Sequence, residues 1–318
     1  MYRVLVMATG EIAVPMLRDL LAGSHEVVAV VTQPDKPVGR KQEVVAGPVK
    51  RCAEAAGVPV LQPRRLRDEG VVEQLRLFGA DVFVVMAYGQ ILSRAVLDLP
   101  RVACLNLHAS LLPRHRGAAP IQAAIDAGDT HTGVDVMYMD EGLDTGDVLL
   151  SARVEILPDE TGGMLHDRLG ALAPGVLAEA LRRLEGGGAP REPQDGALAT
   201  YARKLEREDG WIDWGRGAEA VARRIRAYEP WPGSFFWMPD GFGGLSKCKV
   251  FDVSLGGETD RARSGEIVLL EGDAIGVASV GGVVLIRGMQ VEGKRRMTVR
   301  EYLAGNRLRL GTRLDGRP

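Results

Sequence analysis

Short apolar segments that do not alternate with polar residues are the feature that most limits what this 318-residue chain can fold into. Such segments recur through the first 185 or so residues, at 4–8, 27–31, 58–61, 82–87 and 102–107. Between them apolar residues return at helical spacing, as from Ile12 to Leu21. Strands that are apolar on both faces and separated by helices are typical of a parallel sheet covered on both sides. The sequence therefore predicts a doubly wound α/β domain.

The last third of the chain has a different pattern. A helical segment from Met164 to Leu184 ends in three glycines, and small polar residues, Gly and Pro follow to about Ala199. Beyond residue 240 come short β-rich segments punctuated by Gly, at 249–253, 266–270, 274–280 and 283–287. Such strands indicate a small barrel or sandwich. We therefore predict a domain at 1–186, a linker at 187–204 and a second domain at 205–318.

Charge is unevenly distributed along the chain. The formal net charge is −2, but residues 1–200 carry −6 and residues 201–318 carry +4. Between Leu285 and Arg313, two glutamates accompany eight basic residues: Arg287, Lys294, Arg295, Arg296, Arg300, Arg307, Arg309 and Arg313. This density fits either a phosphate-binding surface or a solubilising one, and charge alone does not separate the two.

Several classes of protein are disfavoured by what the sequence lacks. Cys52, Cys104 and Cys248 are far apart and have no metal-ligand spacing, which argues against a disulfide framework or a zinc site. Neither a membrane-spanning run nor a signal sequence is expected, so the predicted location is the cytoplasm. The turn after the first strand has only Gly10, where a dinucleotide-binding turn needs three glycines.

Asn106 and His108 form the most informative pair of polar residues. They lie two positions apart at the end of an apolar segment, so on an extended strand both side chains point to one face. Ligands of open α/β sheets bind at this carboxyl edge. An amide can donate to a developing oxyanion and an imidazole can move a proton, which suits acyl chemistry. Taken alone, the pair also fits a structural role at the sheet edge.

An acidic loop between two apolar strands is a second candidate. Residues 140–147 carry four carboxylates and two glycines. The spacing does not match a calcium-binding EF-hand loop, so taken alone the segment is most simply a turn with solvated carboxylates. If the loop faces His108, however, one of its carboxylates could orient the imidazole.

These residues carry a resemblance to a known family. The segments Ser110-Leu-Leu-Pro-Arg-His-Arg-Gly-Ala-Ala-Pro-Ile121 and Gly142-Leu-Asp-Thr-Gly-Asp147 resemble motifs of the formyltetrahydrofolate-dependent formyltransferases. The similarity runs nearly end to end, and includes Arg226-Ala-Tyr-Glu-Pro-Trp-Pro232. This later segment resembles a motif of the branch of the family that acts on methionyl-tRNA. The turn Met7-Ala8-Thr9-Gly10-Glu11 departs from the family pattern, since Gly and Thr are swapped and a proline is missing.

The resemblance implies a fold and a reaction. The expected fold is a Rossmann-like catalytic domain followed by an OB-like barrel. The expected co-substrate is 10-formyltetrahydrofolate, with no metal. Asn106, His108 and Asp144 match the catalytic residues, so that Asn106 would stabilise the oxyanion, His108 would transfer the proton and Asp144 would hold the imidazole. The loop that contacts folate matches Ser110, Leu111, Leu112 and Pro113.

The resemblance also implies an acceptor. The α-amine of methionyl-initiator-tRNA would receive the formyl group, for translation initiation. By itself the basic loop from Lys36 to Lys41 is most simply a solvated loop, but in the family it meets the acceptor stem. The expected tRNA-binding residues are Lys36, Arg40, Lys41, Lys294, Arg295 and Arg296. We expect a monomer. Two alternatives stay open: a formyltransferase acting on a small amine, such as a nucleotide sugar or glycinamide ribonucleotide, and a non-catalytic RNA-binding protein.

Overall fold

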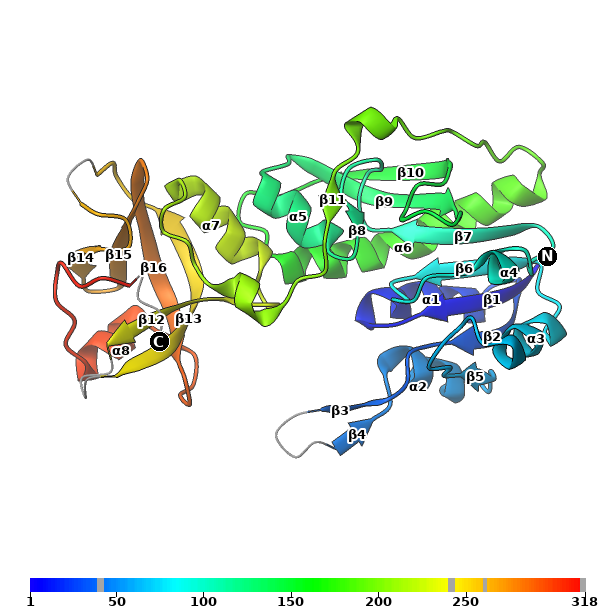
Figure 1. Cartoon of the computed structure of the whole chain (residues 1–318), viewed down its shortest axis with the longest axis horizontal. Helices are drawn as coiled ribbons and strands as arrows, with labels where there is room; N and C mark the ends of the chain where they lie inside the picture. Colours follow the sequence, from blue (N-terminus) through cyan, green and yellow to red (C-terminus); the bar gives the residue numbers. More distant parts are fainter. Residues whose placement is uncertain (39–42, 240–243, 260–261, 315–318) are drawn as a thin grey trace. The chain divides into compact units, whose positions relative to one another are not determined.

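The structure is a computed structural model that describes residues 1–38, 43–239, 244–259 and 262–314 (Figure 1). Two compact units can be distinguished, and each combines segments that are separate in the sequence. Unit 1 consists of Met1–Pro120, His131–Glu155 and His166–Arg203. Unit 2 consists of Ile121–Thr130, Ile156–Leu165 and Lys204–Pro318. Each unit is described separately below.

Unit 1 is built on a seven-stranded sheet with the order β10-β9-β7-β6-β1-β2-β5. Its strands are β1 (Arg3–Ala8), β2 (Glu26–Val31), β5 (Val60–Leu61), β6 (Val82–Met86), β7 (Ala103–His108), β9 (His131–Tyr138) and β10 (Val148–Glu155). Five neighbouring strands, β5, β2, β1, β6 and β7, pair in parallel. Beyond β7, β9 pairs antiparallel with β7, and β10 pairs antiparallel with β9. The doubly wound α/β fold is confirmed, and the antiparallel pair at one edge is an addition to it.

Side chains on both faces of the central strands are buried, which explains their continuous apolar sequence. Leu5 and Met7 of β1 pack in one core cluster with Phe83 of β6, and Val4 and Val6, which alternate with them along the strand, are equally inaccessible. The helices of unit 1 are α1 (Val14–Ala22), α2 (Pro48–Ala55), α3 (Glu69–Leu77), α4 (Arg94–Leu97) and, from His166 onward, α6 (Gly162–Glu185), with the short η1 (Glu11–Ala13) before α1. Burying this much apolar surface, at about 25 cal/mol per Å², is the main stabilising contribution.

Two short ladders lie outside the main sheet. The strands β3 (Lys36–Val38) and β4 (Glu43–Val45) form an antiparallel pair, so Lys36 lies on a strand and not in the solvated loop that the sequence suggested. The strands β8 (Arg116–Gly117) and β11 (Tyr201–Ala202) pair in parallel. The second ladder, with the neighbouring η2 (Gly196–Leu198), brings residues near 200 beside the loop that follows β7.

Unit 2 contains an antiparallel sheet with the order β12-β13-β16-β15-β14, to which β17 is added beside β16. Its elements are α5 (Pro120–Ala127, all but its first residue), η3 (Arg207–Gly210), α7 (Ala218–Ala227), β12 (Ser234–Pro239), β13 (Leu245–Leu255), β14 (Ile267–Glu271), β15 (Ala274–Ser279), β16 (Gly282–Val291), β17 (Met297–Thr298) and α8 (Val299–Gly305). Trp214, Val221 of α7 and Phe236 of β12 belong to its core cluster. The small β domain predicted after the α/β domain is confirmed, and its strands form an antiparallel sheet.

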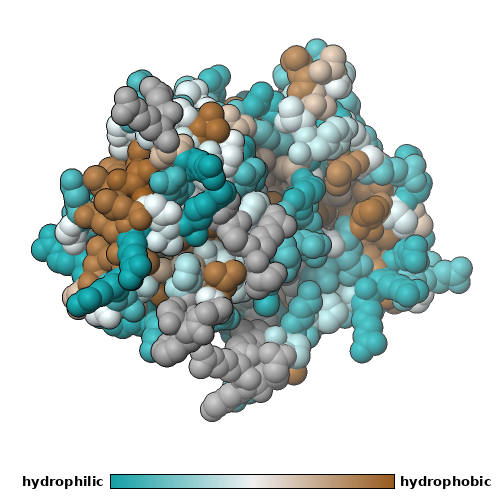
Figure 2. All heavy atoms as spheres, turned by 60° about the vertical axis from the view of Figure 1, so that its left-hand side comes forward, coloured by the Kyte–Doolittle hydropathy of each residue, from teal (hydrophilic) through white to brown (hydrophobic). Residues whose placement is uncertain are grey.

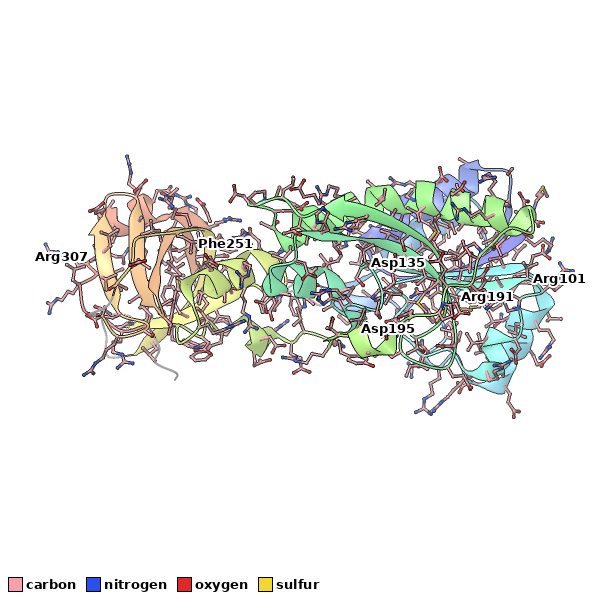
Figure 3. All side chains as sticks on the ribbon, turned by 90° about the horizontal axis from the view of Figure 1, so that it is seen from above. Arg101, Asp135, Arg191, Asp195, Phe251 and Arg307 are labelled. Carbon is pink, nitrogen blue, oxygen red and sulfur yellow. The ribbon has the colours of Figure 1, made fainter. Side chains whose placement is uncertain are left out.

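The surface is mixed in character. On the face shown in Figure 2, hydrophobic side chains form separate patches with hydrophilic side chains between them. In Figure 3 the side chains of Arg101 and Arg307 point outward, while Asp135 lies among the strands of unit 1. Within the described ranges, no helix is both long enough and apolar enough to cross a membrane.

Candidate active site

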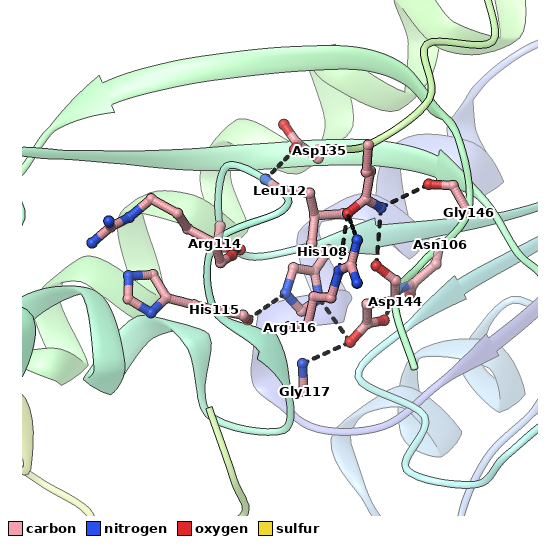
Figure 4. A network of polar contacts seen from close by, with 12 residues as sticks. Asn106, His108, Leu112, Arg114, His115, Arg116, Gly117, Asp135, Asp144 and Gly146 are labelled. Atoms are coloured by element: carbon pink, nitrogen blue, oxygen red, sulfur yellow. Dashed lines mark hydrogen bonds and ion pairs between the residues drawn. The ribbon is translucent and has the colours of Figure 1, made fainter. Parts of the chain in front are cut away.

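The strand β7 carries Asn106 and His108 to the carboxyl edge of the parallel strands. All six residues of β7 are buried, and Asn106 and His108 are 8% and 5% exposed. Both side chains approach Asp144, which lies in the loop between β9 and β10 (Figure 4). Asn106 Nδ2 donates to Asp144 Oδ1 over 3.3 Å, and His108 Nδ1 lies 3.7 Å from Asp144 Oδ2. The three residues that the sequence suggested therefore meet at one place.

Asp144 is held by backbone as well as by side chains. Its φ of 53° is in the left-handed region, which is uncommon for a residue other than glycine. The Gly117 amide donates to Asp144 Oδ2 over 2.8 Å. This charge-assisted hydrogen bond keeps one carboxylate oxygen aimed at the His108 ring.

The other ring nitrogen of His108 has a different neighbour. His108 Nε2 lies 2.9 Å from the backbone oxygen of His115. A carbonyl oxygen can only accept a hydrogen bond, so this contact requires a proton on Nε2. In the neutral ring Nδ1 is then the free base, and it is the nitrogen that faces Asp144. A proton taken up at Nδ1 would form an ion pair with the carboxylate.

Gln194, which lies in unit 1 between α6 and β11, fastens the Asp144 loop. Its Nε2 donates to the backbone oxygens of Asp144, at 2.9 Å, and Gly146, at 2.7 Å. Its Oε1 accepts two hydrogen bonds from the guanidinium of Arg116, at 3.0 and 2.7 Å. Arg116 is only 6% exposed. These contacts link the loop after β7, the loop after β9 and the segment before β11.

The predicted folate loop, Ser110 to Pro113, lies directly after His108. Ser110 is fully buried and donates to the backbone oxygen of Arg114 over 2.7 Å, while Leu111, Leu112 and Pro113 are partly exposed. The Leu112 amide donates over 2.6 Å to Asp135 Oδ2 on β9. The loop thus presents an apolar, accessible edge beside the buried side chains of Asn106 and His108.

Asp135 is a buried carboxyl group opposite His108 in the β7–β9 ladder. It is 1% exposed, and burial raises its pKa from 3.8 to about 6. Hydrogen bonds from Ser151 and the Leu112 amide act in the other direction and only partly offset the burial. The loop of Ser110 to Pro113 is thus anchored by a carboxyl group that gains or loses its proton at about pH 6.

The basic residues predicted for tRNA binding fall in two places. Lys36 is exposed on β3, while Arg40 and Lys41 lie outside the described residues. Lys294, Arg295 and Arg296 are exposed in the turn between β16 and β17. Two of these form ion pairs at 2.7 and 2.8 Å, Arg295 with Glu301 and Arg296 with Glu229. Such exposed pairs are worth about 0–1 kcal/mol, so the guanidinium groups stay available to a phosphate.

Sequence reasoning missed three participants in this site. Asp135 has a visible signal, since it is a lone carboxylate in the apolar run of residues 133–138. Gln194 lies in a segment of weak pattern and gave no signal. His115 is 6% exposed and takes part through its backbone oxygen, which no side-chain pattern reveals. In the part of the chain that the structure describes, no group of three His, Cys, Asp or Glu residues could hold a metal ion.

The chain matches known proteins along nearly its whole length. Residues 2–181 match the Formyl transferase family and residues 204–307 match the Formyl transferase C-terminal domain. The chain is 49% identical to the methionyl-tRNA formyltransferase of Symbiobacterium thermophilum, over 99% of this chain and 96% of that protein. It is 44% identical to the enzyme of the same name from Geobacter sulfurreducens, over 98% and 96%.

A solved structure shares the fold at lower identity. It is an N-formyltransferase from Helicobacter canadensis in complex with folinic acid and dTDP-3-aminofucose. The TM-score is 0.62 at 14% identity, covering 93% of this chain and all of that one.

Proposed function

The chain belongs to the formyl transferase family, in its methionyl-tRNA formyltransferase branch, and we infer that it formylates the α-amine of methionyl-initiator-tRNA for translation initiation. The formyl donor is 10-formyltetrahydrofolate, used as a co-substrate. The similarity to methionyl-tRNA formyltransferases covers both units and nearly the whole length of those relatives. A small-amine acceptor is not favoured by this breadth of match.

The observation that carries the chemistry is the meeting of Asn106, His108 and Asp144. The Asn106 amide and the His108 imidazole lie 3.3 and 3.7 Å from the Asp144 carboxylate at the edge of the sheet. Formyl transfer between two amines needs a donor for the oxyanion and a group that moves one proton. These three residues supply both, and the chemistry needs no metal.

We assign the steps to residues as follows. The unprotonated α-amine attacks the formyl carbon, and the carbonyl oxygen gains negative charge that Asn106 Nδ2 stabilises. His108 accepts the amine proton at Nδ1, where Asp144 balances the new charge, and returns it to the folate nitrogen as the old C–N bond breaks. The products are formylmethionyl-tRNA and tetrahydrofolate, so atoms and charge balance.

The loop Ser110, Leu111, Leu112 and Pro113 is proposed to contact the folate. Its partly exposed apolar edge next to His108 is suited to the flat pteridine and aryl groups of the donor. Asp135 and the Ser110 hydroxyl support the loop from beneath.

The acceptor is proposed to be held by both parts of the chain. Residues 1–186 would form the catalytic domain, 187–204 the connection and 205–318 the tRNA-binding domain. Lys36, Arg40 and Lys41 would meet the acceptor stem, while Lys294, Arg295 and Arg296 would bind phosphates. We propose that the protein works as a monomer in the cytoplasm, where its tRNA substrate is used.

The proposed activity can be tested with purified protein. It should transfer the formyl group from 10-formyltetrahydrofolate to methionyl-initiator-tRNA far faster than to nucleotide sugars or glycinamide ribonucleotide. Faster formylation of a small amine than of the charged tRNA would overturn the assignment. Tight tRNA binding without any transfer would instead indicate a non-catalytic RNA-binding protein.

A further inference from the structure

Unit 2 contains a groove that the proposed catalytic chemistry does not use. Its volume is about 400 Å³, which is within the range of small-ligand sites. It opens between the segment before β12 and the strands β13 and β16. Basic and aromatic side chains line much of it, among them Arg207, Trp231, Phe235, Lys247 and Lys249, with Glu292 at one side.

The strand pattern explains why the two lysines lie together. Lys247 and Lys249 are two residues apart on β13 and so share one face of the sheet. Lys249 is paired with Phe235 on the neighbouring β12. The Lys247 ammonium lies 3.4 Å from the centre of the Phe235 ring, a cation–π contact. The Lys247 ammonium is thereby held over a buried aromatic ring, and Lys249 stands on the same face of the strand.

The groove has more positive charge than its own carboxylates balance. Arg207, Lys247 and Lys249 form no ion pair within 4.0 Å among the residues that the structure describes. Burial lowers the pKa of Lys247, and repulsion from Lys249 lowers it further, against a weaker opposing effect of Glu292. Unpaired cations in a partly buried groove favour binding of an anion.

An aromatic surface accompanies these charges. The Trp231 side chain is 48% exposed, although tryptophan is usually well buried in a folded protein. Gln290 lines the same groove and donates to the backbone oxygen of Lys294, so a hydrogen bond joins the lining of the groove to the first residue of the basic turn. A flat aromatic side chain next to a row of cations is the pattern that binds unpaired nucleotides.

We propose that this groove binds one unpaired nucleotide of an RNA strand. The phosphate lies against Lys247, Lys249 and Arg207, and the base stacks on Trp231. Glu292 can accept a hydrogen bond from the ribose hydroxyl, which distinguishes RNA from DNA. The inference rests on the proposed function only in taking the RNA to be the tRNA substrate.

The test uses the full chain and four probes: inorganic phosphate, AMP, a single-stranded RNA tetranucleotide, and a short RNA duplex. Binding of each is followed through the ¹⁵N-labelled indole groups of the four tryptophans, with the Trp231 signal identified by its loss in Trp231→Phe. The tetranucleotide should shift the Trp231 signal and bind more tightly than AMP, phosphate or the duplex. Equal affinity for phosphate and the tetranucleotide would reduce the groove to a simple anion site and overturn the proposal.

Variants separate the two halves of the groove. Trp231→Ala should weaken tetranucleotide binding about tenfold or more, while Trp231→Phe keeps a stacking surface and should stay within about threefold. Lys247→Gln with Lys249→Gln should weaken binding and lower its salt dependence. The matched control Arg64→Gln with Arg65→Gln removes the same charge from an exposed part of unit 1 and should leave binding unchanged. An equal loss in this control, or none in Trp231→Ala, would contradict the proposal.

Formylation of methionyl-tRNA is measured on the same proteins. If the wild type formylates the tRNA and the tetranucleotide fails to bind, the groove proposal falls and the proposed function stands. If the tetranucleotide binds but no formylation occurs, the proposed function falls. Thermal unfolding of each variant shows whether a loss of binding reflects a loss of folding.

Discussion

The Nε2 nitrogen of His108 is held by a backbone carbonyl, and this contact decides which ring nitrogen can accept a proton from the substrate. The 2.9 Å contact with the His115 oxygen holds the ring through a neutral partner, while the 3.7 Å separation from Asp144 is longer than a hydrogen bond. The carboxylate is therefore near enough to stabilise a charged ring but does not occupy Nδ1. That nitrogen is left free for the proton of the substrate.

Replacing His108 should remove proton transfer without unfolding the protein. We expect His108→Ala to lower kcat for formyl transfer about 10²-fold or more, the usual contribution of a general acid or base. The measurement is steady-state formylation of methionyl-tRNA. His166→Ala removes another imidazole, which is more exposed and pairs with Asp167, and should leave kcat nearly unchanged. Activity of His108→Ala close to wild type would rule out the proposed role.

Asp135 makes the free energy of unfolding decrease as the pH rises, which is the opposite of the usual effect of a carboxyl group. Its folded-state pKa of about 6 exceeds the ordinary 3.8, so the folded protein holds this proton more tightly than the unfolded chain does. Stability from this group is therefore greatest at low pH and is lost as the pH rises from about 4 to 6. At about 1.4 kcal/mol per pKa unit, ionisation costs roughly 2 to 3 kcal/mol.

The variant Asp135→Asn should remove that cost, because asparagine is neutral and can still accept the Leu112 amide. We expect its free energy of unfolding to exceed that of the wild type at pH 8 and the gap to narrow at pH 4.5. Denaturant titrations at several pH values measure this. Asp19→Asn, at an exposed position of α1, is the control and should show no such trend. Parallel curves for Asp135→Asn and wild type would contradict the assignment.

The segment from Glu192 to Ala202 acts as an ordered element although it contains little regular structure. Glu192 forms a bridge with Val148, Gln194 binds two carbonyls of the Asp144 loop, and Tyr201 pairs with Arg116. The active-site loops are thus held from a part of the chain about 50 residues beyond Asp144 in the sequence. Gln194 acts as a positioning residue, since it contacts Asp144 and Gly146 only through their backbone oxygens.

Loss of the Gln194 amide should displace Asp144. Gln194→Glu keeps an acceptor for Arg116 but cannot donate to the two carbonyls, and leaving a buried acceptor unpaired costs about 1–3 kcal/mol. We expect kcat to fall about tenfold while KM for tRNA stays within about twofold. Glu192→Gln, which keeps the backbone bridge to Val148, is the matched control. A change in KM for tRNA alone would argue that Gln194 has another role.

Elements differ in how well the sequence predicts them. The parallel strands were predictable because burial on both faces leaves a continuous apolar run. The orientation of β9 and β10 was not predictable. Apolar strands were expected on both sides of the acidic loop, but the direction of a strand in the sheet depends on its pairing with distant segments. Asn106, His108 and Asp144 were identified from spacing and family motifs. Gln194 was missed because its role depends on a tertiary contact alone.

At the scale of the whole molecule, charge is divided between the two parts of the chain. The overall net charge of −2 would argue against a polyanionic partner, yet residues 201–318 carry +4 and residues 285–313 alone carry +6. A local field of this kind attracts phosphates even when the total is near zero, because salt screens charges beyond about 10 Å. The acidic majority of residues 1–200 therefore does not cancel it.

Neutralising the basic turn tests this division. Lys294→Gln, Arg295→Gln and Arg296→Gln together should raise KM for methionyl-tRNA and leave folate affinity unchanged, because the turn lies outside the proposed folate loop. Each phosphate contact releases close to one counterion, so the slope of log affinity against log salt should become shallower by about two to three.

A matched triple variant shows whether position or total charge matters. Arg64→Gln, Arg65→Gln and Arg67→Gln remove the same three charges from an exposed stretch of unit 1. If the basic turn contacts phosphate, this control keeps the wild-type salt slope, because distant exposed charges are screened. If both triple variants lose the same affinity and slope, only net charge matters, and Lys294, Arg295 and Arg296 do not form a phosphate-binding site.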